Sequence, residues 1–177
     1  GEWLWRASQG LDDSPVTPEH ETKSLSREET FAQDIRDATV LRRELLRLSD
    51  AVASRLRRYG FQARTIGLKL RYGDFSTLTR QTTLEDATDS GPTIYESVLA
   101  LFDAAWDHRA VRLLGVSGTG LTREGRQLRL FEQGDERQAH LDAALDSIRA
   151  RYGERAVQRA SLLEEPEELW IGRTVKK

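Results

Sequence analysis

A short basic stretch carries the side chains of this chain that are best suited to chemistry with a charged partner. It runs from Gln62 to Thr82 and holds a single acid, Asp74. Its cations are Arg64, Lys69, Arg71 and Arg80. Guanidinium and ammonium groups bind phosphate oxygens, and a guanidinium can do so through two parallel hydrogen bonds. The chain has a net charge of −2, so the sequence predicts phosphate binding at this stretch rather than over the whole surface.

The sequence offers no comparable pattern for catalysis. Two-metal nucleotidyl transfer needs carboxylates that converge on paired ions, and the acids of this chain form no such constellation at predicted strand ends. The glycine-rich stretch 115–120 lacks the lysine and hydroxyl of a phosphate-binding loop, and a GxSxG motif is absent. The histidines His20, His108 and His140 are far apart and are interpreted as surface residues. We therefore expect no catalytic residue, metal or cofactor in this chain.

The composition is that of a folded protein with a highly charged surface. The chain has 177 residues, 38% hydrophobic and 32% charged, which suffices for one domain with flanking segments. No apolar run approaches the length of a membrane span, and no secretory signal opens the chain. The chain contains no Cys, so no disulfide is expected and a cytoplasmic protein is predicted. It also contains no Met, which indicates a part of a longer protein.

Two strand-and-helix units must position the basic stretch. Residues 23–31 are expected to form a strand, and residues 32–59 a helix with one apolar stripe. The stripe consists of Leu41, Leu45, Leu48, Val52, Leu56 and Tyr59. Asp34 or Asp37 can cap the start of this helix, and Gly60 suits its end. The arginines on the opposite face of the helix are interpreted as solvated.

The basic stretch itself has the alternation of a β-hairpin. Strands are predicted at 61–72 and 75–83, with a tight turn at 73–74. A second helix begins near Pro92, which suits a first helical turn. Its apolar stripe consists of Ile94, Val98, Leu101, Phe102 and Ala105. Residues 111–116 form the last predicted strand, which ends before the glycine-rich stretch.

The order β-α-β-β-α-β predicts an α+β fold, with a four-stranded antiparallel sheet and both helices on one face. The other face stays open and should carry polar side chains. Alternation places Lys69 and Arg71 on that face, with Thr77, Thr79 and Gln81 as further candidates. A twisted surface rich in cations and hydroxyls is suited to a nucleic-acid backbone.

Shorter segments flank this predicted domain. Residues 1–8 are expected to be the end of a helix, and residues 12–19, which include two prolines, an extended linker. A C-terminal helical extension is predicted at 140–152 from an amphipathic spacing. Its apolar residues are Leu141, Leu145 and Ile148.

Several segments of the chain resemble, in the same order, segments of a known protein family. They are GEWLWRASQGLDDSPV at the start, KSLSREETF from Lys23, ARTIGLKLRYGDFSTLTRQTTL from Ala63, VRLLGVSGTGL from Val111 and RQLRLF from Arg126. The later stretch LDAALDSIRARYGERAVQRASLL also fits. Together they resemble the C-terminal region of the Y-family translesion DNA polymerases, in the DNA polymerase IV group.

The resemblance implies four parts. They are the end of a thumb with a linker at 1–22, a little-finger DNA-binding domain at 23–120, a clamp-binding segment at 121–136, and a C-terminal helix and tail at 137–177. It implies sequence-independent binding of damaged or primer–template duplex DNA, and recruitment to a sliding clamp. The catalytic palm with its Mg²⁺ would belong to a missing part of the parent enzyme, a nucleotidyltransferase.

Site residues follow from the same resemblance, position by position. Those expected to contact DNA are Lys23, Ser24, Ser26, Arg27, Thr77, Thr79, Arg80, Gln81, Arg112 and Ser117, in addition to Lys69 and Arg71 of the open face. Ser26 stands where the family commonly has Gly, which would alter the approach of a backbone. The residues expected to bind the clamp are Gln127, Leu128, Leu130 and Phe131. Without the resemblance, the sequence favours Leu128 and Leu130 as residues that pack inside a strand.

Two other classes of protein share the element order. RNA-binding modules of this fold stack bases on aromatic side chains of their central strands, whereas Tyr72 and Phe75 stand beside the predicted turn. A non-catalytic, polymerase-like accessory subunit, or another protein-interaction domain, has the same fold, and fold alone does not separate it from a polymerase domain.

Overall fold

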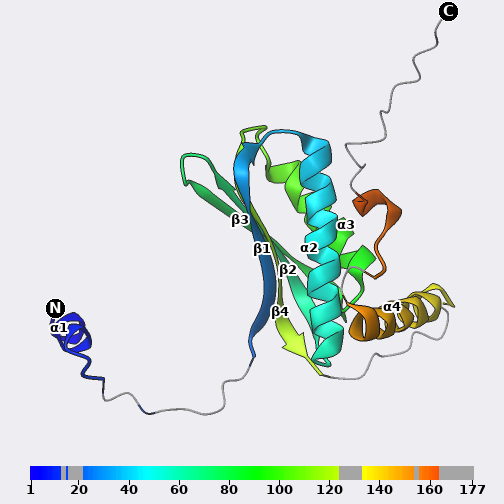
Figure 1. Cartoon of the computed structure of the whole chain (residues 1–177), viewed down its shortest axis with the longest axis horizontal. Coiled ribbons are helices and arrows are strands. Elements are labelled where there is room, and N and C mark those ends of the chain that lie inside the picture. The colour runs from blue at the N-terminus through cyan, green and yellow to red at the C-terminus, as the bar shows by residue number, and fades with distance from the viewer. Residues whose placement is uncertain (13–14, 16–21, 124–132, 154–155, 164–177) are drawn as a thin grey trace, which may run out of the picture.

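The structure is a four-stranded antiparallel sheet with helices packed on one of its faces (Figure 1). The computed structural model describes residues 1–12, 15, 22–123, 133–153 and 156–163. The strands are β1 (Ser24–Ile35), β2 (Gln62–Tyr72), β3 (Thr77–Thr88) and β4 (Val111–Thr122), in the spatial order β1-β4-β2-β3. The helices are α1 (Glu2–Ser8), α2 (Ala38–Arg58), α3 (Gly91–Ala105) and α4 (Gln133–Tyr152), followed by a short 3-10 helix, η1 (Ala160–Leu162). The predicted fold class is confirmed.

The core lies between the sheet and the helices α2 and α3. The predicted helical stripes supply its helix side, with the fully buried Leu41, Leu45, Leu48, Val52, Leu56, Ile94, Val98 and Phe102. The sheet supplies Ile66, Leu68, Leu70 and Leu114. Burying each of these large aliphatic or aromatic side chains contributes roughly 1.5–3 kcal/mol to folding. Tyr59 was expected to end the first stripe, but it is the half-exposed C-cap of α2.

The first strand is longer than predicted, and the first long helix starts later. β1 continues to Ile35 because its pairing with β4 reaches that residue. α2 begins at Ala38, where the Asp37 carboxylate accepts hydrogen bonds from the amides of Thr39 (2.7 Å) and Val40 (3.3 Å). These bonds hold the pKa of Asp37 below its ordinary value. The predicted helix start at residue 32 was therefore wrong, and Asp37 is the cap.

The last strand also exceeds its prediction, since β4 runs through the glycine-rich stretch to Thr122. Glycine weakens a strand by itself, but β4 is paired on both sides, with β1 and β2. Gly118 lies on the helix side of the sheet, where an added Cβ would stand 2.8 Å from the Cβ of Ala63. Two hydrogen-bonded ladders and close packing therefore override the low strand propensity of glycine, and the predicted end at residue 116 was wrong.

The turn between β2 and β3 presents an aromatic side chain in an unusual backbone conformation. The Tyr72 amide donates to the Ser76 carbonyl (3.0 Å), and the Phe75 amide donates to the Tyr72 carbonyl (2.9 Å). These bonds hold Phe75 at a φ of 64°, in the left-handed region that bulky residues rarely adopt. The Arg109 guanidinium stacks over the Tyr72 ring at 3.7 Å and supports the strand end beside the turn. The predicted hairpin is present, with its second strand starting at Thr77.

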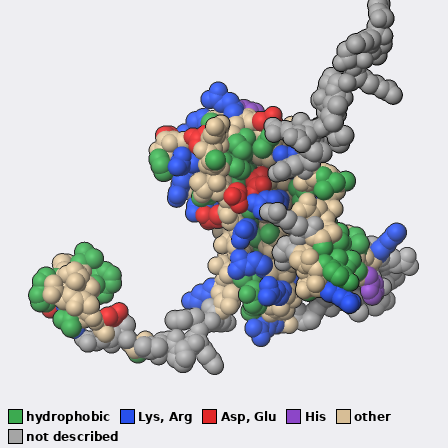
Figure 2. All heavy atoms as spheres, viewed as in Figure 1, with side chains coloured by type: hydrophobic (Ala, Val, Ile, Leu, Met, Phe, Trp, Pro, Cys, Tyr) green, Lys and Arg blue, Asp and Glu red, His purple; other side chains and the backbone are tan. Residues whose placement is uncertain are grey.

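The arginines of α2 are less uniformly solvated than predicted. Figure 2 shows basic side chains gathered along α2 and beside it. Arg47 pairs with Glu44 at 2.6 Å and with Glu29 of β1 at 2.8 Å. Arg55 donates to the Ser26 carbonyl, and Arg57 is largely buried in contacts with α4. Several of these cations therefore join α2 to its neighbours.

The C-terminal extension packs against α2 through polar side chains. α4 starts earlier than the predicted residue 140, and its expected apolar stripe is not buried, since Leu141 is 51% exposed and Ile148 37% exposed. Its inward contacts are made by Asp142 and Asp146, which both accept hydrogen bonds from Arg57. The amphipathic spacing thus predicted a helix that is present, although Leu141 and Ile148 remain exposed.

The helix predicted at the start of the chain is present as α1. Trp3, Leu4 and Trp5 are exposed on it, and it has no buried residue. None of the helices in the described part of the chain has the length and apolar composition needed to cross a bilayer.

Candidate nucleic-acid interface

The face of the sheet that lies opposite α2 and α3 is largely polar along all four strands, with Leu113 of β4 as its apolar residue. Strand pairing places its residues in rows across β1, β4, β2 and β3. The rows are Ser24–Thr119–Thr65–Thr83, Ser26–Ser117–Gly67–Gln81, Glu28–Gly115–Lys69–Thr79 and Thr30–Leu113–Arg71–Thr77. We call this surface the open face, because neither α2, α3 nor α4 lies on it (Figure 1). Hydroxyl side chains dominate it, and Lys69 and Arg71 carry its positive charge.

Lys69 lies flat across the centre of the open face. It starts on β2, and its Nζ donates to both carboxylate oxygens of Glu28 on β1, at 3.0 and 3.1 Å. β4 separates these strands, and the residue between the two side chains is Gly115. A Cβ at Gly115 would stand 2.9 Å from Glu28 Cγ and 3.3 Å from Lys69 Cβ. The missing side chain at Gly115 thus provides the space through which the ion pair forms.

Arg71 is held by a neutral partner instead. Its Nε donates to the Thr77 hydroxyl on β3 at 3.0 Å. Farther along the same two strands, the hydroxyls of Thr65 and Thr83 lie 3.2 Å apart, which confirms that these side chains share one face. A guanidinium bound to a single hydroxyl retains both its charge and further donors for an anion.

Strand alternation separates Arg27 and Arg80 from the open face. Arg27 is paired with Val116, and Arg80 with Leu68, and both of these partners are buried against the helices. The two arginines therefore project to the helix side of the edge strands β1 and β3, where both are exposed. The sequence placed them with the open-face residues through the family resemblance, whereas the period of two along each strand separates them.

The last two expected contacts lie at the ends of strands. Arg112 falls at an irregularity in the pairing of β4 with β2, with its guanidinium 4.8 Å from the centre of the Phe75 ring and 3.7 Å from Asp34. Lys23 is exposed and directly precedes β1. The structure therefore gathers eight of the expected DNA contacts on one face: Ser24, Ser26, Lys69, Arg71, Thr77, Thr79, Gln81 and Ser117.

Comparison with known proteins identifies the domain. Residues 22–130 match the family model described as the impB/mucB/samB family C-terminal domain. The chain belongs to this family. The matched residues include the whole sheet with α2 and α3, so the open face is a surface of the family domain itself.

The chain is similar to several proteins named DNA polymerase IV. It is 40% identical over 158 residues to the DNA polymerase IV of Dehalococcoides mccartyi (strain ATCC BAA-2266 / KCTC 15142 / 195), across 88% of the chain and 40% of that protein. It is 39% identical over 164 residues to the DNA polymerase IV of Moorella thermoacetica, across 90% of the chain and 41% of that protein. The chain thus spans about two fifths of the length of these curated relatives. A solved Y-family DNA polymerase chimera aligns at 17% identity with a TM-score of 0.48, over 68% of this chain and 34% of that one.

The resemblance predicted from the sequence segments is therefore confirmed. It covers the region that the family model matches and extends beyond it, since the alignments with the relatives cover most of the chain. The residues expected to bind a clamp, Gln127, Leu128, Leu130 and Phe131, lie outside the described residues.

Sequence reasoning missed Glu28 and Gly115 as residues of the open face. Glu28 was not among the residues expected on this face. The signal that could have found it is its position: Glu28 lies two residues after Ser26 and four after Ser24, and residues at this spacing share one face of a strand. Gly67 and Gly115 leave space at the centre of the face because they have no side chains. A Cβ at Gly67 would stand 2.5 Å from the Ser117 hydroxyl.

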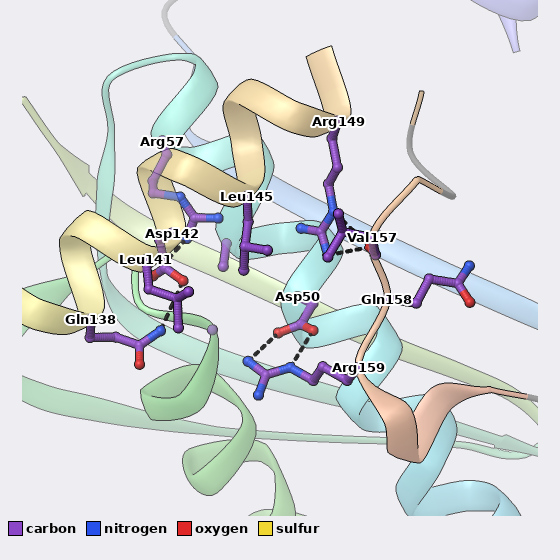
Figure 3. A pocket seen from close by; sticks show the side chains of 12 residues that line it. Asp50, Arg57, Gln138, Leu141, Asp142, Leu145, Arg149, Val157, Gln158 and Arg159 are labelled. Carbon is purple, nitrogen blue, oxygen red and sulfur yellow. Dashed lines mark hydrogen bonds and ion pairs between the residues drawn. The ribbon is translucent and has the colours of Figure 1, made fainter. Parts of the chain in front are cut away.

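A second concave site lies between α2, α4 and residues 156–163, with a volume of about 160 Å³ (Figure 3). Its polar and charged side chains bind one another: Arg159 donates to both oxygens of Asp50, at 2.7 and 3.1 Å, and Gln138 donates to Asp142 at 2.9 Å. We interpret this cavity as the joint between the extension and the domain. Among the described residues, no group of three or more His, Asp or Glu side chains is arranged to hold a metal ion.

Proposed function

We propose that the open face binds the sugar–phosphate backbone of duplex DNA without regard to base sequence, as part of a translesion DNA polymerase of the DNA polymerase IV type. One observation carries the proposal: Lys69 and Arg71 stand among hydroxyl side chains on a sheet face that the helices leave uncovered. Family membership and the names of the relatives support the same function.

The chemistry of the open face favours phosphate contacts over base reading. Phosphate contacts position a protein on DNA but carry no sequence information, which suits an enzyme that must accept damaged templates. The hydroxyl, lysine and arginine side chains of this face are all donors to phosphate oxygens. On the central strands β2 and β4, both fully described, the open-face residues include no aromatic side chain on which a base could stack. This composition disfavours the alternative of an RNA-binding module.

The test is the salt dependence of duplex binding. Each phosphate that the protein neutralises contributes a slope of roughly −0.9 to log affinity against log salt. The double variant Lys69→Gln/Arg71→Gln should bind a fluorescein-labelled primer–template duplex more weakly at low salt, and its slope should be shallower by about 0.9 for each phosphate that is no longer neutralised. Fluorescence anisotropy at several salt concentrations measures both quantities.

The matched control is Arg42→Gln/Arg58→Gln, which removes two exposed cations from α2 on the other side of the sheet. It has the same change in net charge as the open-face variant, so long-range electrostatics alone would weaken binding equally in both. Equal weakening, or undiminished binding by the open-face variant, would remove the open face as the DNA-binding surface.

Recruitment to a sliding clamp is the second part of the proposed function. Gln127, Leu128, Leu130 and Phe131 form the pattern Gln-Leu-x-Leu-Phe, in which a few apolar anchors can carry most of the binding energy. Leu130→Ala/Phe131→Ala should abolish binding to an immobilised clamp and leave the thermal unfolding midpoint unchanged, whereas Arg129→Ala should retain binding. If the double variant unfolds instead, these residues belong to the core and the clamp proposal fails.

In this proposal, nucleotidyl transfer and its Mg²⁺ belong to a palm that this chain does not contain. The segments 1–22, 23–120, 121–136 and 137–177 would then serve as thumb end and linker, DNA-binding domain, clamp-binding segment and C-terminal extension. An accessory subunit without catalysis would share the DNA-binding surface and lack the palm, so primer extension by the full-length protein separates the two possibilities.

A further inference from the structure

Glu28 places a negative charge on the surface that is proposed to receive phosphates. It lies in the same row as Lys69, and its carboxylate accepts two hydrogen bonds from the Lys69 ammonium. A carboxylate resembles a phosphate in presenting two anionic oxygens to the same donors. In the free protein, Glu28 therefore occupies the position that a DNA phosphate would need to take beside Lys69.

The ion pair has little role in holding the fold together. Both side chains are substantially solvated, with exposed fractions of 32% for Lys69 and 40% for Glu28, and exposed ion pairs contribute little to stability. The neighbouring Glu29 differs, because it points to the helix side and joins β1 to Arg47 of α2. Two adjacent carboxylates of β1 thus have separate functions, one on each face of the sheet.

The pair also distinguishes the two cations of the open face. Arg71 donates to the neutral Thr77 hydroxyl, so its charge is not cancelled by that partner. Lys69 is neutralised by Glu28, and the space over Gly115 keeps its side chain flat against the sheet. Release from Glu28 would free the ammonium to rise toward a phosphate.

We propose that Glu28 sets the affinity of the open face for duplex DNA by competing with phosphate for Lys69. The inference rests on the proposed function of the open face as the DNA-binding surface. Binding of DNA exchanges the carboxylate for a phosphate at the Lys69 ammonium, and the displaced carboxylate must be accommodated near a polyanion. Glu28 thereby keeps binding weak and readily reversible.

The experiment is a double-mutant cycle on duplex affinity. Glu28→Gln, Lys69→Gln and the double variant are compared with the unmodified chain by fluorescence anisotropy, with the same labelled duplex at several salt concentrations. Glu28→Gln should tighten binding by about two- to fivefold at low salt, the range expected for an exposed ion pair. It should also steepen the salt slope by up to about 0.9, because Lys69 then neutralises a phosphate without releasing a carboxylate charge beside it. In the Lys69→Gln background the same substitution should change affinity by less than half as much.

Glu29→Gln is the matched control, since it removes the same charge one residue away on the other face, and it should leave duplex affinity within about 1.5-fold of the unmodified chain. Equal tightening by Glu28→Gln in both backgrounds would mean general repulsion rather than competition, and would overturn the proposal. Unchanged or weaker binding by Glu28→Gln would overturn it too.

The failure of the proposed function looks different. If Lys69→Gln/Arg71→Gln binds duplex as well as the unmodified chain, the open face is not the DNA surface, and the role of Glu28 falls with it. If that variant binds weakly while Glu28→Gln has no effect, the open face stands and only the competition is rejected. Should Glu28→Gln fold poorly, Glu28→Thr provides the same test with a residue that favours strands.

Discussion

Arg57 of α2 and Asp146 of α4 form a two-point ion pair, with Nε 2.6 Å from Oδ2 and Nη2 3.1 Å from Oδ1. Arg57 also donates to Asp142 at 3.3 Å and to the Asp89 carbonyl at 2.8 Å. Burial lowers the pKa of Arg57, but the hydrogen bond and charge of Asp146 more than offset that, so the pKa is raised. One side chain thus joins α4, the start of α3 and α2.

Replacing Arg57 by Ala should release α4 from the domain. The two aspartates would no longer share a donor, and removal of hydrogen bonds to a charged group costs about 1.5–3 kcal/mol. We expect amide hydrogen exchange to accelerate across residues 138–149, while exchange in β2 and β4 stays slow. Hydrogen-exchange mass spectrometry resolves the two regions.

Arg58→Ala is the control for this prediction, because Arg58 is the exposed neighbour of Arg57 on the same helix turn. It should leave exchange in α4 unchanged. Unaltered exchange in the Arg57→Ala variant would show that α4 is held by contacts other than this ion pair.

The Asp37 cap should make α2 sensitive to acid. Its hydrogen bonds from Thr39 and Val40 keep the pKa of Asp37 below the ordinary value. A carboxyl whose pKa is lowered in the folded state contributes its full stabilisation of the fold at a pH above its unfolded-state pKa of about 3.9. This stabilisation is lost as the pH falls through the lower folded-state pKa. Asp37→Ala should therefore lower the thermal unfolding midpoint at neutral pH, and its deficit relative to the unmodified chain should shrink in acid.

Asp37→Asn separates charge from capping, since Asn also caps helices well but does not titrate. Its midpoint at neutral pH should lie above that of Asp37→Ala, and its difference from the unmodified chain should also narrow in acid. A deficit of Asp37→Ala that is constant from neutral pH down to the lowest accessible pH would contradict the role given to the Asp37 carboxylate.

Gly118 is predicted to tolerate no side chain. An added Cβ would lie 2.8 Å from the Cβ of Ala63 and 3.7 Å from a methyl of Leu56. Overpacking of this kind costs typically about 1–3 kcal/mol, so Gly118→Ala should lower the free energy of unfolding by that amount in urea titrations. The double variant Ala63→Gly/Gly118→Ala removes the clash and should be more stable than the sum of the single effects predicts. Strict additivity of the two substitutions would indicate that the close contact is not the cause.

The two arginines on the helix side offer a test of which face meets DNA. Arg27→Gln/Arg80→Gln removes as much charge as Lys69→Gln/Arg71→Gln, but from the opposite face of the edge strands. We expect it to reduce duplex affinity less, and to change the slope of log affinity against log salt by less than about 0.9. A reduction as large as that of the open-face variant would mean that DNA wraps around the sheet edges.

Local pattern was sufficient for most of the fold. The leucine spacing of α2 and the alternation of β2 each predicted the buried side of their element, because packing in this domain follows helix and strand periodicity. The same alternation placed Lys69 and Arg71 correctly on the face without helices. Element ends were harder to predict, since β1 and β4 are extended by mutual pairing, an interaction between residues far apart in the chain.

The features that escaped prediction depend on side chains from separate elements. The pair between Lys69 and Glu28 requires three strands in register and a glycine in the middle one. The docking of α4 requires Arg57 to meet two aspartates more than eighty residues away. The misplacement of Arg27 and Arg80 has another cause. Strand alternation from Ser26 and Thr79 would have placed both arginines on the helix side, and only the family resemblance grouped them with the open face.

The position of β4 constrains how this domain is made on the ribosome. β4 is the last of the four strands to be synthesised, yet it lies between β1 and β2, and β1 pairs with no other strand of this sheet. Before residue 122 has emerged, the nascent chain can form the β2–β3 hairpin, and α2 can pack on α3. β1 still lacks the strand with which it pairs, and the apolar residues of α2 that face β1 and β4 remain uncovered. Assembly must therefore be late and dominated by distant contacts, which slows folding and leaves apolar surface exposed. Chaperones that bind nascent chains would therefore meet the most exposed apolar surface after α2 has been synthesised and before β4 is complete.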